Sequence, residues 1–149
     1  MDKSDVTLRR ATRDDIPVWA KMRNQLWPES SASDHVRDLR RSIKDGKFKA
    51  WMACRRDVPI GFAELYIRPF ANGCLGKPVP FLEGIWVSPE HRRRGVAQAL
   101  VHAVSRWAQK RGYREIGSDA DVRNTLSHRC HSAWGFSETE RVVYFRKEL

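Results

Sequence analysis

The chain has 149 residues, of which 41% are hydrophobic and 31% charged, and its formal net charge is +10. This length is enough for one domain with a buried core, so we expect a single domain over residues 1–149. No stretch has the apolar length of a membrane span and the N-terminus lacks the apolar core of a signal peptide, so we expect a cytoplasmic protein without a membrane partner.

The high positive net charge suggests a partner of opposite charge. Nucleic acid, an acidic membrane surface or a phosphorylated cofactor would each fit a net charge of +10. The basic residues are dispersed apart from Arg40-Arg41 and Arg92-Arg93-Arg94, and no recognised nucleic-acid motif accompanies them. The cysteines are widely spaced and odd in number, which predicts reduced thiols and no metal site: Cys54, Cys74 and Cys130.

The first third of the chain reads as one strand followed by two helices. Val6 to Ala11 is typical of a strand. Thr12 and Asp15 have the spacing of a helix cap, and the helix that follows ends before Pro28. A second helix is expected from Ser33 to Gly46, with apolar residues at helical spacing.

Three further strands are expected in the middle of the chain. Residues 48–55 and 60–67 predict a hairpin, because turn-forming residues separate two β-rich runs. Residues 68–80 are rich in Pro and Gly and predict a loop, and aperiodic loops of this length are often functional. The last of these three, Phe81 to Val87, is the fourth strand of the chain; it is apolar and ends at Ser88-Pro89.

A basic turn joins this fourth strand to a helix. Apolar residues recur at helical spacing after Gly95, namely Val96, Leu100, Val104 and Trp107. Residues 92–97 therefore lie at a helix N-terminus, where free amides, the helix dipole and the arginine charges favour a polyanion such as a pyrophosphate. The alternative is that an Arg-rich turn is a solvated surface loop.

The last third predicts a strand, a short helix and a final strand. The long helix is expected to end around Arg111-Gly112, and Glu115 to Asp119 is typical of a strand. Asn124 to Trp134 predicts a helix that Gly135 terminates, and Val142 to Lys147 predicts the last strand.

The basic turn resembles the acetyl-CoA site of the GNAT superfamily of N-acetyltransferases. The family pattern is Arg or Gln, two residues, Gly, one residue, then Gly or Ala, and Arg92, Gly95 and Ala97 stand at those places. The resemblance covers nearly the whole chain. It implies an α/β (α+β) fold whose mixed sheet has parallel fourth and fifth strands that splay apart, and an acyltransferase that uses acetyl-CoA and no metal.

The resemblance also implies which residues hold the cosubstrate. In the family, main-chain groups at the end of the fourth strand pair with the pantetheine arm, which here implies Ile85, Trp86 and Val87. Backbone amides of the turn hold the pyrophosphate, which implies Arg93, Arg94, Gly95, Val96, Ala97 and Gln98. The Val87 amide is the implied contact to the thioester oxygen. Gly84 fits a bulge that frees these groups.

Two side chains are candidates for proton transfer. Glu83 lies in an otherwise apolar strand, so it is either a salt-bridged structural residue or the anchor and proton acceptor of a cationic substrate. Residues 124–136 resemble the family's second signature at Asn124, Gly135 and Phe136, which places Asn124 in the cofactor site. His131 replaces the Tyr that commonly protonates the thiolate, so either His131 is the acid or no side chain is.

One subgroup is a closer match. Several short runs look like the aminoglycoside 6'-N-acetyltransferases in the same order: 25–28, 72–74, 81–85, 118–119, 124–125 and 138–142. The resemblance implies five substrate-binding residues, with Phe70 standing where Tyr is usual: Trp27, Phe70, Glu83, Asp119 and Glu140. Because aminoglycosides are polycations, we expect a locally negative cleft.

The sequence thus predicts direct acetyl transfer from acetyl-CoA to the 6'-amine of an aminoglycoside, which confers resistance to the antibiotic. One alternative keeps the fold and acetylates a polyamine or a protein amine. The other is a basic module that binds nucleic acid, which we do not expect to be a partner. The resemblance implies a homodimer, in whose interface Val142 to Lys147 could take part.

Overall fold

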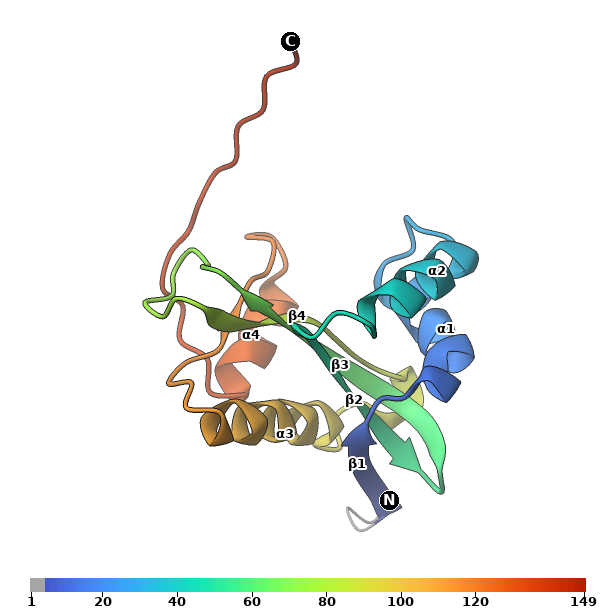
Figure 1. Cartoon of the computed structure of the whole chain (residues 1–149). Coiled ribbons are helices and arrows are strands. Elements are labelled where there is room, and N and C mark those ends of the chain that lie inside the picture. Colours follow the sequence, from blue (N-terminus) through green and yellow to red (C-terminus); the bar gives the residue numbers. More distant parts are fainter. Residues whose placement is uncertain (1–4) are drawn as a thin grey trace.

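The computed structural model describes residues 5–149 and consists of one five-stranded sheet with helices on both faces (Figure 1). The strands lie in the order β1 (Val6–Arg10), β2 (Phe48–Arg55), β3 (Val58–Arg68), β4 (Val79–Val87) and β5 (Gly117–Ser118). The first three pairings are antiparallel, and β4 and β5 are parallel. This arrangement confirms the predicted mixed sheet.

The helices cover the sheet in two pairs (Figure 1). They are α1 (Ile16–Leu26), α2 (Ala32–Ser42), α3 (Val96–Lys110) and α4 (Thr125–Ala133). One core cluster joins α1 and α2 to the sheet through Trp19, Leu39 and Phe62. A second cluster joins α3 to the opposite face through Leu65 and Leu100. Since alternate residues of a strand face opposite ways, Phe62 and Leu65 contribute to different cores.

The helix starts follow from local capping. The predicted capping box is present, with Asp15 accepting from the Thr12 amide at 2.7 Å. The second helix begins earlier than expected, because Ser31 accepts from the Asp34 amide at 3.1 Å and the Asp34 carboxylate accepts from the Ser31 amide at 3.3 Å. This reciprocal pair fixes the N-terminus at Ala32 instead of after Ser33.

Two strand boundaries also differ from expectation. The hairpin loop is only Arg56-Asp57, both with positive φ, which gives β3 a start at Val58. The fourth strand begins at Val79, whereas β5 shrinks from the expected Glu115–Asp119 to Gly117–Ser118. Glu115 instead turns toward the loop before β4 and accepts from the amide of Leu75 at 2.7 Å.

The predicted strand over Val142–Lys147 is wrong. Residues after 136 form no helix or strand in this structure. Thr139 lies against Gly73, and the chain beyond it extends away from the body of the molecule (Figure 1). The composition of this segment favours a strand, but a strand also needs a partner, and the segment pairs with no strand among residues 5–149.

The four helices are too short or too polar for a membrane span. No helix in the described part of the chain has the length and hydropathy needed to cross a membrane.

Candidate active site

The fourth strand carries a bulge at Glu83-Gly84. In the register with β3, Gly84 lies opposite Glu64 and Leu82 opposite Leu65, so one extra residue is inserted. This confirms the bulge predicted at Gly84. A Cβ on Gly84 would lie 2.5 Å from Cη2 of Trp27, so only glycine lets the indole ring lie directly on the strand.

Beyond the bulge, one edge of β4 is open. The parallel pairing to β5 ends at Leu82 and Ser118. Ser88 N–H donates to Ile60 O, and hydrogen-bonded pairs alternate along an antiparallel ladder, so Trp86 also pairs with β3. The main-chain groups of Ile85 and Val87 therefore point to the open edge. Those of Trp86 point to β3, so the main-chain contact expected from Trp86 is not available.

The turn before α3 presents a row of amides. Arg93 and Gly95 have positive φ values of 61° and 81°, which curves the backbone into a concave nest. The amides of residues 93–98 donate to no acceptor within residues 5–149. The Arg92 amide does not join them, because it donates to Pro89 O at 3.3 Å. The side-chain Nε of Arg92 donates to Val87 O at 2.8 Å and ties the turn to the end of β4. The geometry suits a pyrophosphate group.

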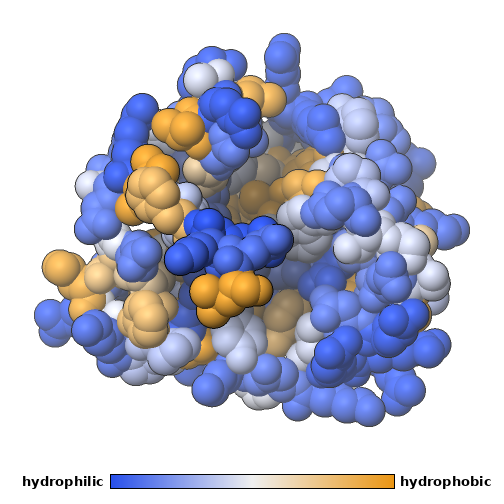
Figure 2. Space-filling view, turned by 90° about the horizontal axis from the view of Figure 1, so that it is seen from above, coloured by the Kyte–Doolittle hydropathy of each residue, from blue (hydrophilic) through white to orange (hydrophobic). Residues whose placement is uncertain are grey.

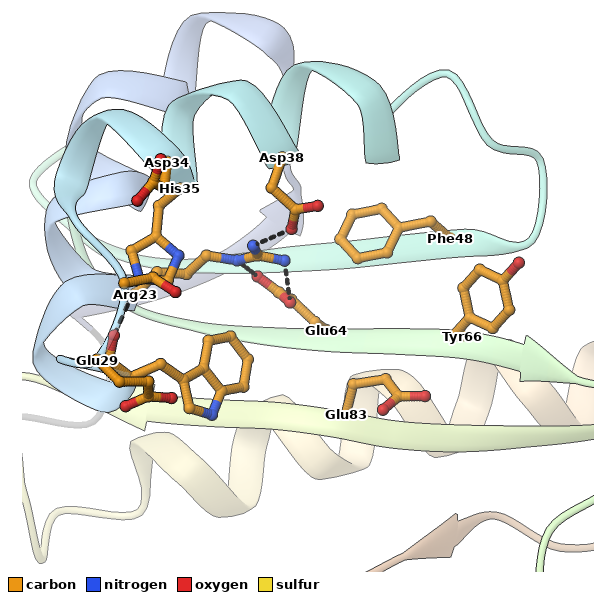
Figure 3. Close-up of a pocket in the computed structure, with 11 residues that line it drawn as sticks. Arg23, Glu29, Asp34, His35, Asp38, Phe48, Glu64, Tyr66 and Glu83 are labelled. Atoms are coloured by element: carbon orange, nitrogen blue, oxygen red, sulfur yellow. Dashed lines mark hydrogen bonds and ion pairs between the residues drawn. The ribbon is translucent and has the colours of Figure 1, made fainter. Parts of the chain in front are cut away.

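A cavity of about 610 Å³ lies between α2, the end of α1 and the sheet (Figure 3). Trp27 and Glu83 line it, as the predicted substrate site requires. Apart from His35, the only basic residue of its lining is Arg23. The lining also contains five carboxylates: Glu29, Asp34, Asp38, Glu64 and Glu83. The cavity is thus locally acidic in a strongly basic protein, which suits a cationic ligand.

The floor of this cavity is a buried ion-pair network. Glu64, 1% exposed, accepts two hydrogen bonds from Arg23 at 2.6 and 2.7 Å and one from Trp19 Nε1 at 2.8 Å. Arg23 also donates to Asp38 at 2.6 Å (Figure 3). A buried guanidinium with all these partners is held rigidly, so it fixes the position of the cavity wall.

Glu83 forms a salt bridge, as one of its two interpretations required. Both of its oxygens accept from Arg68, at 2.8 and 2.7 Å, and the side chain stays 28% exposed at the cavity. The hydrogen bonds to Glu83, together with the charges of Glu83 and Asp119, raise the pKa of Arg68. Asp119 itself does not line the cavity. Phe70 is 62% exposed and Glu140 is exposed in the C-terminal segment, and neither lines the cavity.

The other signature residues lie around α4. Asn124 caps the helix, with its Oδ1 accepting from the Ser127 amide at 3.1 Å. His131 Nε2 lies 2.8 Å from Ser118 Oγ, and its Nδ1 lies 2.8 Å from Ser127 O. The imidazole thus lies against β5, where β4 and β5 separate.

The comparisons with known proteins agree with this geometry. A model of the acetyltransferase (GNAT) family matches residues 17–136. The chain belongs to this family. The resemblance predicted from Arg92, Gly95 and Ala97 is confirmed, and so is the GNAT fold.

Several relatives within the GNAT family are similar over nearly their whole length. Aminoglycoside N(6')-acetyltransferase type 1 of Salmonella typhimurium is 42% identical, over 94% of this chain and 97% of the relative. The protein of the same name from Stenotrophomonas maltophilia is also 42% identical, over 100% and 97%. The structure of AAC(6')-Iy with the bisubstrate analog CoA-S-monomethyl-acetylneamine superposes with a TM-score of 0.90 at 40% identity, over 97% of this chain and 99% of that one.

Sequence reasoning missed several residues of this GNAT site. Asp34 and Asp38 lie one helical turn apart on α2, a spacing visible in the sequence but lost among other charged residues. The role of Arg68 as the partner of Glu83 carried no sequence signal. It depends on the antiparallel register of β3 and β4, which brings together residues 15 positions apart.

Proposed function

We propose that this protein is an aminoglycoside 6'-N-acetyltransferase, which transfers acetyl directly from acetyl-CoA to the 6'-amine of the antibiotic and so confers resistance. The observation that carries this proposal is the acidic cavity beside the open edge of β4, in a chain 42% identical to enzymes of that name. Acetylation removes a positive charge and hydrogen-bond donors, which weakens the hold of the drug on RNA.

The residues around the open edge suit acetyl-CoA. The amides of residues 93–98 and the guanidinium groups of Arg93 and Arg94 would hold its phosphates, and Asn124 would border the same site. The outward main-chain groups of Ile85 would pair with the pantetheine arm, whereas Val87 O already accepts from Arg92. The Val87 amide is our candidate for stabilising the thioester oxygen as negative charge develops on it.

The acidic groups around the cavity suit the acceptor. Trp27 supplies a ring face and Glu83 a carboxylate to the cavity, and the charge of Asp119 contributes to the raised pKa of Arg68, the partner of Glu83. An ammonium group of the substrate can compete with Arg68 for Glu83, because that pair remains partly exposed. Glu83 would then hold the amine and accept its proton, directly or through water.

We also propose that the protein is a homodimer joined through its C-terminal segments. Val142, Val143, Tyr144 and Phe145 are 49 to 94% exposed, which is unusual for four consecutive apolar residues. Figure 2 shows hydrophobic side chains exposed among hydrophilic ones on the face seen from above. In the described part of the chain β5 pairs only with β4, so its second edge can accept a strand from a second copy. Glu140 lies directly before this segment, so its place relative to a substrate depends on that docking.

Release of CoA with a panel of acceptors tests the function. The panel is tobramycin, kanamycin, a derivative blocked at the 6'-amine, spermidine and a lysine peptide. We expect turnover only with drugs that have a free 6'-amine. Turnover on spermidine or the peptide, with the antibiotics inert, would overturn the substrate assignment and keep the acetyltransferase.

A further inference from the structure

The imidazole of His131 lies in a short chain of hydrogen bonds between two carbonyl oxygens. At one end, Nδ1 lies 2.8 Å from Ser127 O. At the other, Nε2 lies 2.8 Å from Ser118 Oγ, and Ser118 Oγ lies 3.4 Å from Leu82 O. The rings of Trp134 and Phe136, with centroids 5.2 Å away, hold the imidazole in this orientation.

The number of hydrogens in this chain depends on the charge of His131. A carbonyl oxygen only accepts, so the short contact to Ser127 O requires a hydrogen on Nδ1. If the Ser118 hydroxyl also donates to Leu82 O, its bond to Nε2 needs a second hydrogen on the ring. All bonds are therefore made only when His131 is an imidazolium. A neutral ring that keeps its hydrogen on Nδ1 requires the Ser118 hydroxyl to turn from Leu82 toward Nε2, whereas one with its hydrogen on Nε2 would accept at Nδ1 from Ser127 Oγ, 3.2 Å away.

The hydroxyl of Ser118 lies where the two parallel strands part. Ser118 is the last residue of β5 and is paired with Leu82, directly before the bulge at Glu83-Gly84. The contact to Leu82 O is long for a hydroxyl donor, so this hydrogen is easily redirected. His131 reaches Ser118 from α4.

We propose that Ser118 is the catalytic residue that protonates the leaving sulfur, and that His131 acts through it as the proton source. This inference rests on the proposed acetyl transfer. As the C–N bond to the amine forms and the C–S bond breaks with its electron pair on sulfur, the Ser118 hydroxyl gives its hydrogen to the sulfur and takes one from Nε2. His131 becomes neutral, keeps its Nδ1 hydrogen on Ser127 O, and is protonated again from solvent. The substrate nitrogen loses two protons through Glu83 or water, one from the ammonium before the attack and one as the amide forms.

The charged groups around His131 do not interrupt this path. Its direct contacts are uncharged hydroxyl, carbonyl and aromatic groups. The nearest titratable groups along the two elements are Asp119 after β5 and His128, the exposed Arg129 and Cys130 on α4. His128 Nε2 lies 2.9 Å from Asp121 O instead.

The test uses single-turnover rates with acetyl-CoA and tobramycin. We expect Ser118→Ala to lower the acetyl-transfer rate about 100-fold with little change in KM, because general-acid catalysis is lost and binding is not. Ser118→Thr, which keeps the hydroxyl, should restore most of the rate. His131→Gln should lower the rate similarly, and the Ser118→Ala/His131→Gln double variant should be no slower than either single one. Ser132→Ala, an exposed hydroxyl beside His131, is the matched control.

Nitrogen-15 NMR of His131 in the free protein gives a readout that does not depend on turnover. We expect the neutral imidazole of His131 to carry its hydrogen on Nδ1. The chemical shift of Nε2 should change in Ser118→Ala and stay unchanged in Ser132→Ala. An unchanged Nε2 shift, or a wild-type transfer rate in Ser118→Ala, would overturn the proposal. If the wild-type protein acetylates no aminoglycoside, the proposed function fails, while the NMR result still decides whether this chain of hydrogen bonds exists.

Discussion

At the scale of single residues, Asp15 links the first strand to the first helix. Its carboxylate accepts from Arg9 at 2.7 and 2.8 Å and from the Thr12 amide at 2.7 Å. The hydrogen bonds from Arg9 hold the pKa of Asp15 below its ordinary value. A depressed folded-state pKa stabilises the protein above the unfolded-state pKa of about 4, and this contribution disappears as the pH falls through the folded-state pKa.

We therefore expect Asp15→Asn to lower the free energy of unfolding by about 1–3 kcal/mol at pH 7. The difference from the wild type should shrink as the pH falls below about 4, because the unfolded-state carboxyl becomes neutral there and the folded-state carboxyl follows at a lower pH. Urea titrations at pH 7 and pH 3 measure it. A difference that is equal at both pH values would show that the ion pair with Arg9 does not contribute.

Gly84 is the residue on which the position of Trp27 depends. A methyl group at Gly84 would overlap the indole, whose nearest atoms would be 2.5 and 2.7 Å from the new Cβ. We expect Gly84→Ala to displace the ring and raise KM for tobramycin about tenfold, with a smaller change in KM for acetyl-CoA. Gly46→Ala is the control, since a Cβ at Gly46 meets nothing within 4 Å. Equal effects of the two substitutions would argue against Trp27 as part of the acceptor site.

At the scale of elements, the turn before α3 is the feature that the sequence predicted best. Gly95, the arginine run and the apolar spacing after it are local signals, and the structure places a helix start at Val96 as expected. The acidic cavity could be anticipated only in part. Its carboxylates come from α2, β3, β4 and the loop after α1, and only tertiary packing brings them together.

The same turn allows a prediction about cosubstrate affinity. Arg93→Ala/Arg94→Ala should weaken acetyl-CoA binding about tenfold or more and reduce its salt dependence, because two cations beside the phosphates are lost. Calorimetric titration with CoA measures this affinity. Arg106→Ala, an exposed arginine of α3, removes the same type of charge further along the helix. If it weakened binding equally, only the overall charge of the protein would matter.

At the scale of the whole molecule, the C-terminal segment shows where a sequence pattern is insufficient. Val142–Lys147 has the composition of a strand, yet the partner of a strand is not encoded in its own residues. In the proposed homodimer, the missing partner is β5 of a second copy. The β-rich tail would then form its strand in the dimer, while the fold of each chain stays as described.

The homodimer predicts a mass twice that of the chain, about 17.3 kDa per copy, in light scattering after size exclusion. Val143→Asp/Phe145→Asp should shift the mass toward the monomer, because charges would be buried at the strand interface. Val58→Asp, at an equally exposed valine of the β2–β3 hairpin, should leave the mass unchanged. A wild-type protein that is monomeric at micromolar concentration would contradict this assembly.

The most direct measurement is the position of the acetyl group in the product formed from tobramycin, determined by two-dimensional NMR of the purified product. The acidic cavity, the open edge of β4 and the similarity to aminoglycoside N(6')-acetyltransferases predict a single acetyl group on the 6'-nitrogen. An acetyl group on any other nitrogen of tobramycin would contradict the proposed substrate orientation at Glu83 and Trp27. Tobramycin left unmodified by a protein that acetylates a different amine compound would contradict it as well.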